Sequence, residues 1–150
     1  MSALFILFRK GEQNIMLKKT LTYEDFNGNQ RTEDYYFNLT KAELMEMELS
    51  ADGGLEATIN KIIAAQNGKE IMELFKEIVL KAYGEKSLDG KTFDKSPEVK
   101  NRFLNSQAYS DIFMELATNA DEATKFFNGI IPKDIANEVK KQNLKAVPAN

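Results

Sequence analysis

Three oxygen-bearing side chains, Asp25, Asn27 and Asn29, alternate along one short stretch with the spacing of the first ligands in a calcium-binding EF-hand loop. The sixth position of that loop is Gln30 instead of glycine, and the twelfth is Tyr36 instead of glutamate. The stretch also contains an Asn-Gly pair, which is typical of a tight β-hairpin turn. We therefore predict a turn here and no metal site.

Carboxylates also gather at Glu43, Glu46 and Glu48, in a segment whose apolar spacing indicates one helix. Neighbouring carboxylates could act as a general acid and base, or could hold a divalent cation. A solvated acidic helix face is much commoner, and we favour it. Gly53 and Gly54 precede a second predicted helix without the GxGxxG pattern or GKS/GKT ending of phosphate-binding loops, so they indicate a helix break.

The composition removes most routes to catalysis. The 150 residues include no histidine, cysteine or tryptophan. The chain thus lacks a proton shuttle near neutral pH, a Ser-His or Cys-His pair, a thiolate zinc site and any disulfide. An enzyme would depend on Asp, Glu, Lys or Ser alone, as in a carboxylate-based hydrolase. We predict that the chain is not an enzyme and uses no cofactor and no metal.

Charge and hydropathy exclude two classes of partner. The 23 acidic and 20 basic residues are interspersed and give a net charge of -3, so no basic stripe is available for nucleic acid. The apolar run at residues 3–8 is far shorter than the roughly 20 residues that span a bilayer. It also precedes Arg9 and Lys10, whereas a signal peptide has its charges first. We predict no nucleic acid and no membrane as partners, and residence in the cytoplasm.

Two apolar groups are candidates for binding another protein. The first combines leucines and methionines near residues 44–49, where flexible thioether side chains can adapt to a partner. The second is a pair of phenylalanines in a segment too short to bury both by itself. The predicted partner-binding residues are Leu44, Met45, Met47, Phe126 and Phe127. Ordinary core packing is the alternative for both groups.

A β-hairpin must precede these groups. Residues 17–23 and 31–37 are rich in β-branched and aromatic types and flank the Asn27-Gly28 turn. A second turn or small hairpin is predicted over residues 85–95, which contain Asp89-Gly90.

Helices account for most of the remaining chain. Thr40 and Glu43 form a capping-box pattern, Ser96 precedes Pro97, and Asp121 is placed as a capping acid. Gly84 and Gly129 are placed to end helices, the former in left-handed geometry. The predicted helices cover residues 40–49, 55–67, 69–83, 96–104, 106–118, 121–128 and 132–143, and 69–83 is the best candidate for the core helix. The expected fold is α+β and predominantly α-helical, with an N-terminal β-hairpin packed on a bundle of five to seven helices.

One globular domain is expected, over residues 16–143. Residues 144–150 lack periodicity and are predicted to be a flexible tail. Residues 1–15 form an extension of doubtful nativeness, because Lys10-Gly11-Glu12 can be encoded by a purine-rich ribosome-binding sequence shortly before Met16. Met16 is then the expected start.

Three segments carry a resemblance to a known family: residues 22–28 (TYEDFNG), 36–44 (YFNLTKAEL) and 113–118 (FMELAT). In this order they resemble the tail assembly chaperones of long-tailed, siphovirus-type bacteriophages of Gram-positive bacteria. The resemblance spans about residues 16–132 and consists of packing and turn segments without a catalytic signature.

The resemblance implies a protein that binds the phage tape measure protein in the cytoplasm of the infected host and keeps it soluble. It also implies promotion of tail tube polymerisation around the tape measure, with the tail tube protein as a further partner and no place in the mature virion. A longer form made by ribosomal frameshifting is another implication. The alternatives are a structural tail or virion component that self-associates, and a small acidic regulatory binding protein.

Overall fold

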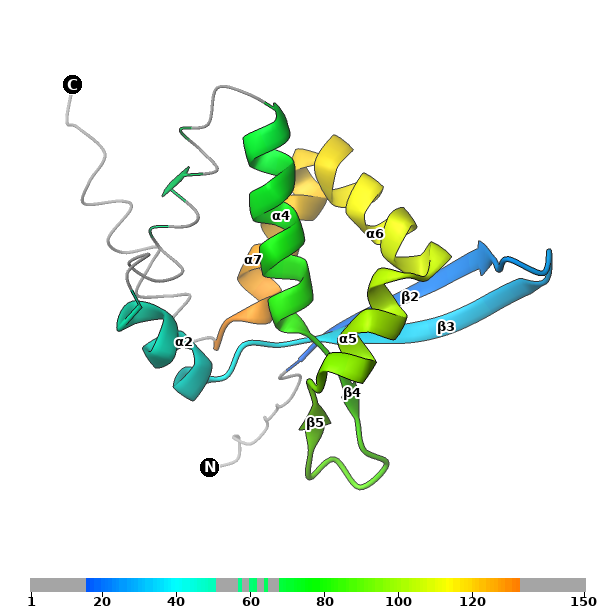
Figure 1. Ribbon diagram of the computed structural model, residues 1–150, viewed down its shortest axis with the longest axis horizontal. Helices are drawn as coiled ribbons and strands as arrows, with labels where there is room; N and C mark the ends of the chain where they lie inside the picture. Colours follow the sequence, from blue (N-terminus) through cyan, green and yellow to red (C-terminus); the bar gives the residue numbers. More distant parts are fainter. Residues whose placement is uncertain (1–15, 51–56, 58–59, 62–63, 65–67, 133–150) are drawn as a thin grey trace, which may run out of the picture.

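The computed structural model describes residues 16–50, 57, 60–61, 64 and 68–132. These residues form a four-stranded antiparallel sheet and a larger set of helices (Figure 1), so the predicted α+β, mainly helical class is confirmed. The elements are β2 (Leu17–Glu24), β3 (Gln30–Phe37), α2 (Lys41–Glu48), α4 (Gly68–Ala82), β4 (Tyr83–Lys86), β5 (Phe93–Asp94), α5 (Pro97–Leu104), α6 (Gln107–Thr118) and α7 (Ala120–Ile130).

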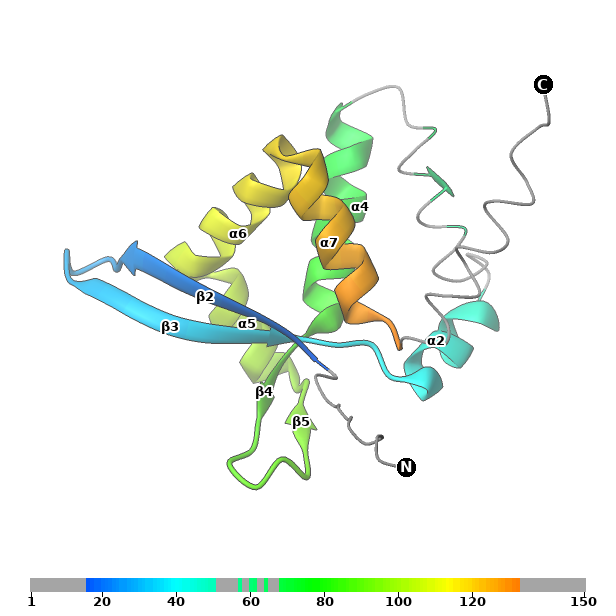
Figure 2. The ribbon, with the colours of Figure 1, turned by 180° about the vertical axis from the view of Figure 1, so that it is seen from behind.

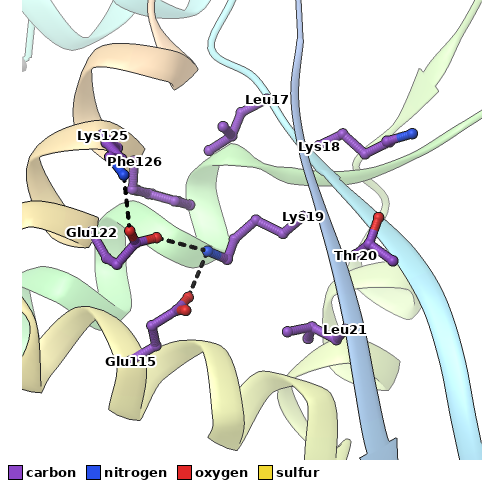
Figure 3. A pocket seen from close by; sticks show the side chains of 9 residues that line it. All are labelled: Leu17, Lys18, Lys19, Thr20, Leu21, Glu115, Glu122, Lys125 and Phe126. Atoms are coloured by element: carbon purple, nitrogen blue, oxygen red, sulfur yellow. Dashed lines mark hydrogen bonds and ion pairs between the residues drawn. The ribbon is translucent and has the colours of Figure 1, made fainter.

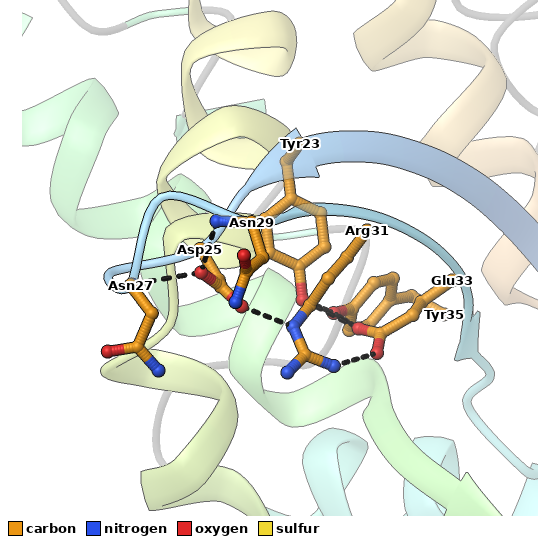
Figure 4. Close-up of polar contacts among 7 residues, drawn as sticks. All are labelled: Tyr23, Asp25, Asn27, Asn29, Arg31, Glu33 and Tyr35. Carbon is orange, nitrogen blue, oxygen red and sulfur yellow. Dashed lines mark hydrogen bonds and ion pairs between the residues drawn. The ribbon is translucent and has the colours of Figure 1, made fainter.

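The predicted hairpin is confirmed as β2 and β3, which pair along their full length. At its turn, Asp25 Oδ1 accepts hydrogen bonds from the backbone amides of Asn27 and Asn29, both at 2.9 Å. Gly28 has a φ of 84°, the left-handed conformation that glycine adopts at least cost. Asp25 Oδ2 lies 2.6 Å from Arg31 Nε (Figure 4). Both carboxylate oxygens of Asp25 therefore stabilise the turn.

The helices cover one face of the hairpin and leave the other to solvent (Figures 1 and 2). Residues of β2 alternate between half-buried and exposed along the strand, as expected for a sheet covered on one face. The core lies between this inner face and α4, α6 and α7. Its largest fully buried side chains include Phe37 from β3, Ile78 from α4, Ile112 from α6 and Phe126 from α7. The prediction that α4 is a core helix is thus confirmed.

The sheet extends beyond the hairpin, because β4 pairs with the end of β3 and β5 pairs with β4. The predicted small hairpin at residues 85–95 is confirmed, with Gly90 at a φ of 75°. The expectation that Gly84 ends α4 in left-handed geometry is wrong, since Gly84 lies in β4 opposite Tyr36. A Cβ there would lie 2.9 Å from ring carbons of Phe93 and 3.0 Å from the carbonyl oxygen of Asp94. Glycine is required by this close approach.

The end of α4 is stabilised by another helix instead. The ammonium group of Lys100 on α5 donates to the carbonyl oxygens of Leu80, Lys81 and Tyr83. The Ala82 carbonyl accepts from the amide of Asn38 at 2.9 Å. These bonds satisfy carbonyls that a left-handed glycine would otherwise help to satisfy.

The predicted bounds of α7 are also wrong. Its N-cap is Asn119, whose side chain accepts from the amide of Glu122 at 3.2 Å, and the helix continues through Gly129 to Ile130. A Cβ at Gly129 would lie 2.9 Å from Leu17 Cδ1, so this glycine allows α7 to approach β2 closely. The caps predicted at Thr40 and at residues 96–97 are confirmed.

Several predicted segments lie outside the described residues. These are the extension 1–15, the helix 55–67 apart from helical residues 57, 60, 61 and 64, and residues 133–150, which include nearly all of the predicted helix 132–143 and the tail.

Candidate partner-binding site

The short helix α2 is positioned by a capping box at its start. The amide of Glu43 donates to Thr40 Oγ1 at 3.1 Å, and the amide of Thr40 donates to Glu43 Oε1 at 2.8 Å. Two backbone amides that the helix itself cannot satisfy thereby gain partners. An eight-residue helix is marginal in isolation, so its placement depends on such contacts.

A second contact ties α2 to the end of the sheet. Lys95 Nζ lies 2.6 Å from Glu43 Oε2 and donates to the carbonyl oxygen of Asn38 at 2.7 Å. Burial raises the pKa of Glu43, but the hydrogen bonds from Lys95 and Thr40 outweigh burial, and the pKa lies below its usual range. Glu43 is therefore ionised near neutral pH and holds α2 against the residue that follows β5.

The inner side of α2 is fastened by Leu44 and Met47, which are both buried in the core. Met45 is 66% exposed, and Leu49, which caps the end of the helix, is 82% exposed. Met45 and Leu49 are four residues apart and therefore lie on the same side of the helix, one turn from each other. We call Met45 and Leu49 the α2 outer pair.

The five residues predicted from the sequence to bind a partner differ in their exposure to solvent. Leu44, Met47 and Phe126 are buried in this chain's own core, and Met45 is exposed. Phe127 is half-buried, with its ring stacked on Phe75 at 5.7 Å between centroids. Three of the five thus fasten the helices, and Met45 is the one that presents a large apolar surface to solvent.

The three carboxylates of α2 also differ in their surroundings. Glu43 serves the capping box and the pair with Lys95, whereas Glu46 and Glu48 are exposed. The outer pair is therefore bordered by negative charge on its own helix, in agreement with the predicted acidic helix face. Across the residues that the structure describes, no group of three or more acidic, histidine or cysteine side chains is arranged to hold a metal ion.

A polar hollow of about 290 Å³ lies between β2 and the helices α6 and α7 (Figure 3). Lys19 reaches across it, with its Nζ 2.5 Å from Glu115 Oε1 and 3.8 Å from Glu122 Oε1. Lys125 Nζ lies 3.3 Å from the other oxygen of Glu122. Both acids are thus paired with lysines, and the network joins the hairpin to two helices.

Two tyrosines and one carboxylate form a second polar cluster on the inner face of the hairpin (Figure 4). Tyr23 and Tyr35 donate to Glu33 Oε1 at 2.6 Å and 2.8 Å, and Arg31 Nη1 lies 3.5 Å from Glu33 Oε2. The hydrogen bonds from the two tyrosines hold the pKa of Glu33 below its usual range. Burial raises the pKa of Tyr35, so its hydroxyl remains a neutral donor.

Further large apolar side chains are exposed that were not named from the sequence. Phe26 lies in the β2–β3 turn, Leu88 in the β4–β5 turn, Met72 on α4 and Met114 on α6. A large apolar residue inside a turn segment is a usable signal, because the turn carries it away from the core. No such signal distinguishes Met72 or Met114 from core residues.

The fold and this surface define a small α+β protein with apolar side chains presented on an anchored helix, a class suited to binding another protein. Over the described part of the chain, no helix is long and apolar enough to cross a membrane. The chain belongs to the phage tail assembly chaperone family, since that family's model matches residues 16–150. No curated protein and no solved structure matches the chain.

The family confirms the resemblance to tail assembly chaperones that the three sequence segments indicated. A chaperone role is non-enzymatic and involves contact with other tail proteins.

Proposed function

We propose that this chaperone binds the phage tape measure protein through the α2 outer pair, keeps it soluble, and promotes polymerisation of the tail tube around it. The setting is the cytoplasm of an infected Gram-positive bacterium during assembly of a siphovirus-type tail, and the chaperone is absent from the mature virion. The observation that supports this proposal is the exposure of Met45 and Leu49 on a helix whose other side is fastened in the core.

The geometry suits an apolar helical partner. A tape measure helix awaiting assembly exposes apolar stripes that would aggregate, and covering them with apolar side chains removes that surface from water. Met45 offers a flexible thioether that adapts to different side chains along such a stripe. The exposed Glu46 and Glu48 form a polar rim, which suits a reversible contact.

Holding of this kind needs no nucleotide. The chaperone binds the unassembled tape measure segment, and tube subunits displace it by forming a larger interface with the same segment. In this scheme Met45 makes direct contact and Phe127 lies half-exposed as a secondary contact. Leu44, Met47 and Phe126 act from the core by keeping the helices in place.

The proposal is tested by co-expressing the chain with the tape measure protein of the same phage, with an affinity tag on one of them. The variant Met45→Ser/Leu49→Ser removes both apolar side chains of the outer pair. Each fully buried side chain contributes about 1.5–3 kcal/mol to binding, so the double variant is expected to lose about 3 kcal/mol, or roughly 100-fold in affinity. The amount of soluble, co-purified tape measure protein should fall accordingly.

Met114→Ser is the matched control, because Met114 is also an exposed methionine but lies on α6. It should leave co-purification unchanged, and circular dichroism should show that all variants remain folded. If the double variant retains the tape measure protein as well as the wild type does, the outer pair is not the contact. If the wild-type chain leaves the tape measure insoluble, the proposed partner is wrong.

A further inference from the structure

One edge of the sheet is β2, a strand of eight residues that pairs only with β3 in the described part of the chain. The opposite edge is β5, which has two residues. Natural sheets avoid pairing with other chains through very short edge strands, prolines, bulges or unpaired charges that face inward. The first three are missing from β2, which is long, contains no proline and runs in unbroken register with β3.

The inward-facing charge of β2 is Lys19, and it is neutralised within the chain. Its side chain points from the strand toward the helices (Figure 3), and its Nζ lies 2.5 Å from Glu115 Oε1. Only 15% of the Lys19 side chain is exposed. This charge therefore does not repel an approaching strand, and the edge of β2 is open to pairing.

The backbone groups at this edge belong to the even-numbered residues of β2. In an antiparallel ladder, hydrogen-bonded pairs alternate with non-bonded pairs. The amide of Asp25 donates to the carbonyl oxygen of Asn29 at 2.9 Å, so the odd-numbered residues of β2 are the ones bonded to β3. The N–H and C=O groups that point away from β3, and the side chains exposed on the outer face, are those of Lys18, Thr20, Thr22 and Glu24.

These four residues are complementary to a second copy of themselves. When two β2 strands run antiparallel about a two-fold axis at Leu21, Lys18 of each copy lies opposite Glu24 of the other. Thr20 then lies opposite Thr22, and cross-strand pairs of opposite charge or of threonines stabilise a sheet. No ion pair in the described part of the chain involves Lys18 or Glu24, so both charges are available. A shift of two residues in either direction places both charges opposite uncharged residues.

The inner face gains an apolar contact in the same alignment, because Leu21 meets the Leu21 of the second copy. Leu21 is half-buried, packs against the core and lines the polar hollow beside α6 and α7. It belongs to a non-bonded pair, in which opposing side chains lie closest. The two leucines therefore cover part of each other's exposed surface.

We propose that two copies of this chain associate by antiparallel pairing of their β2 edges, which joins their two sheets into one. Lys18 and Glu24 fix the alignment, and Leu21 lies on the two-fold axis. A single strand pair buries less area than a standard interface, so we expect a weak dimer with a dissociation constant of about 10–100 µM. This surface is separate from the α2 outer pair, and the inference does not depend on tape measure binding.

Sedimentation velocity of the full chain, from low micromolar to millimolar concentration, measures the association. Lys18→Glu places carboxylates opposite each other at both ends of the strand pair, and Glu24→Lys does the same with ammonium groups. Each variant should dimerise about tenfold more weakly than the wild type. Both positions are exposed and without an ion pair in the described residues, so the fold should persist, as circular dichroism can verify.

An equimolar mixture of the two variants tests the alignment itself. In a mixed pair, each carboxylate of one chain faces an ammonium group of the other, so the mixture should associate about as tightly as the wild type. Lys91→Glu is the matched control, because it makes the same change of charge in the exposed β4–β5 turn. It should leave the association unchanged.

Hydrogen exchange identifies the surface that forms the dimer. The amides of Thr20 and Thr22 point to the open edge and should exchange more slowly as the concentration rises. The amide of Leu21 points to β3 and should be protected at every concentration.

The proposal is overturned if the full chain remains monomeric up to millimolar concentration, or if the mixed variants associate no better than each variant alone. It is also overturned if the chain dimerises while the Thr20 and Thr22 amides exchange as fast as in the monomer, because another surface then forms the dimer. None of these measurements contains the tape measure protein, so their failure is distinct from failure of the proposed function.

Discussion

Replacing Glu43 with glutamine tests whether the contact with Lys95 holds α2 in place. Exposed ion pairs contribute about 0–1 kcal/mol, whereas breaking a fully buried pair costs about 3–5 kcal/mol. The side chains of Glu43 and Lys95 are 25% and 17% exposed, between these limits. We expect Glu43→Gln to lower the free energy of unfolding by about 2 kcal/mol, or the melting temperature by about 4–8 °C. Glutamine can still accept from the Thr40 amide, so the loss reports mainly on Lys95.

The assay is urea unfolding followed by far-ultraviolet circular dichroism, on Glu43→Gln, Lys95→Met and the double variant. If the two groups act as a pair, the double variant should cost little more than either single change, with a coupling of about 1–2 kcal/mol. Lys125→Met is the control: Lys125 pairs with Glu122 but is largely exposed, and the change should stay within about 0.5 kcal/mol. A coupling between Glu43 and Lys95 below about 0.5 kcal/mol would refute the reasoning.

The same pair predicts a pH dependence of definite sign. The pKa of Glu43 is lower in the folded chain than in the unfolded one, where it is about 4.3. The stabilisation is therefore complete above the unfolded-state pKa and is lost as the pH falls through the folded-state pKa. The stability difference between the wild type and Glu43→Gln should be largest near neutral pH and should shrink on acidification. A difference that grows in acid would contradict the assignment.

Two further predictions follow from the strand and turn contacts. Gly84→Ala should cost about 2 kcal/mol in urea unfolding, because its Cβ would meet the Phe93 ring and the fixed Asp94 carbonyl; an unchanged midpoint would mean that β5 can move aside. Asp25→Ala should speed hydrogen exchange of the hairpin-tip amides and free the Arg31 side chain, while exchange in the core helices stays the same; slowed or unaltered exchange at the tip would contradict the role given to this carboxylate.

Much of the local structure was predictable from short sequence signals. The Asn27-Gly28 pair demands a tight turn between two β-rich segments, and the structure has the hairpin there. Thr40 followed three residues later by Glu43 predicts a capping box, and both of its hydrogen bonds are present. These signals succeed because the interacting groups are near neighbours in sequence. A stretch of a few residues therefore contains every group that forms the turn or the cap.

The glycines at positions 84 and 129 show where such signals fail. Each was read as a helix end, because glycine tolerates left-handed backbone geometry. Both are instead needed for close packing, against Phe93 in one case and Leu17 in the other. Leu17 lies more than 100 residues from Gly129 in the chain, and no local pattern shows which neighbour the absent side chain makes room for.

The candidate site was likewise predictable from the sequence only in part. Composition pointed away from catalysis, two apolar groups were candidates for protein binding, and the three resembling segments pointed to the tail assembly chaperone family, to which the chain belongs. Met45 and Met47 are indistinguishable by residue type, yet one is exposed and the other is buried. The difference depends on which side of α2 meets the core.

The sequence by itself determined the hairpin, most helix starts, the mainly helical α+β class and the family, since each rests on local chemistry or on matching segments. Tertiary structure alone decided the link between Glu43 and Lys95, the extension of the sheet by β4 and β5, and the ion pairs that join Lys19 to Glu115 and Glu122. These features join residues that are far apart in the chain. Their energies depend on distance and burial in the folded state, and neither quantity exists until the helices pack on the hairpin.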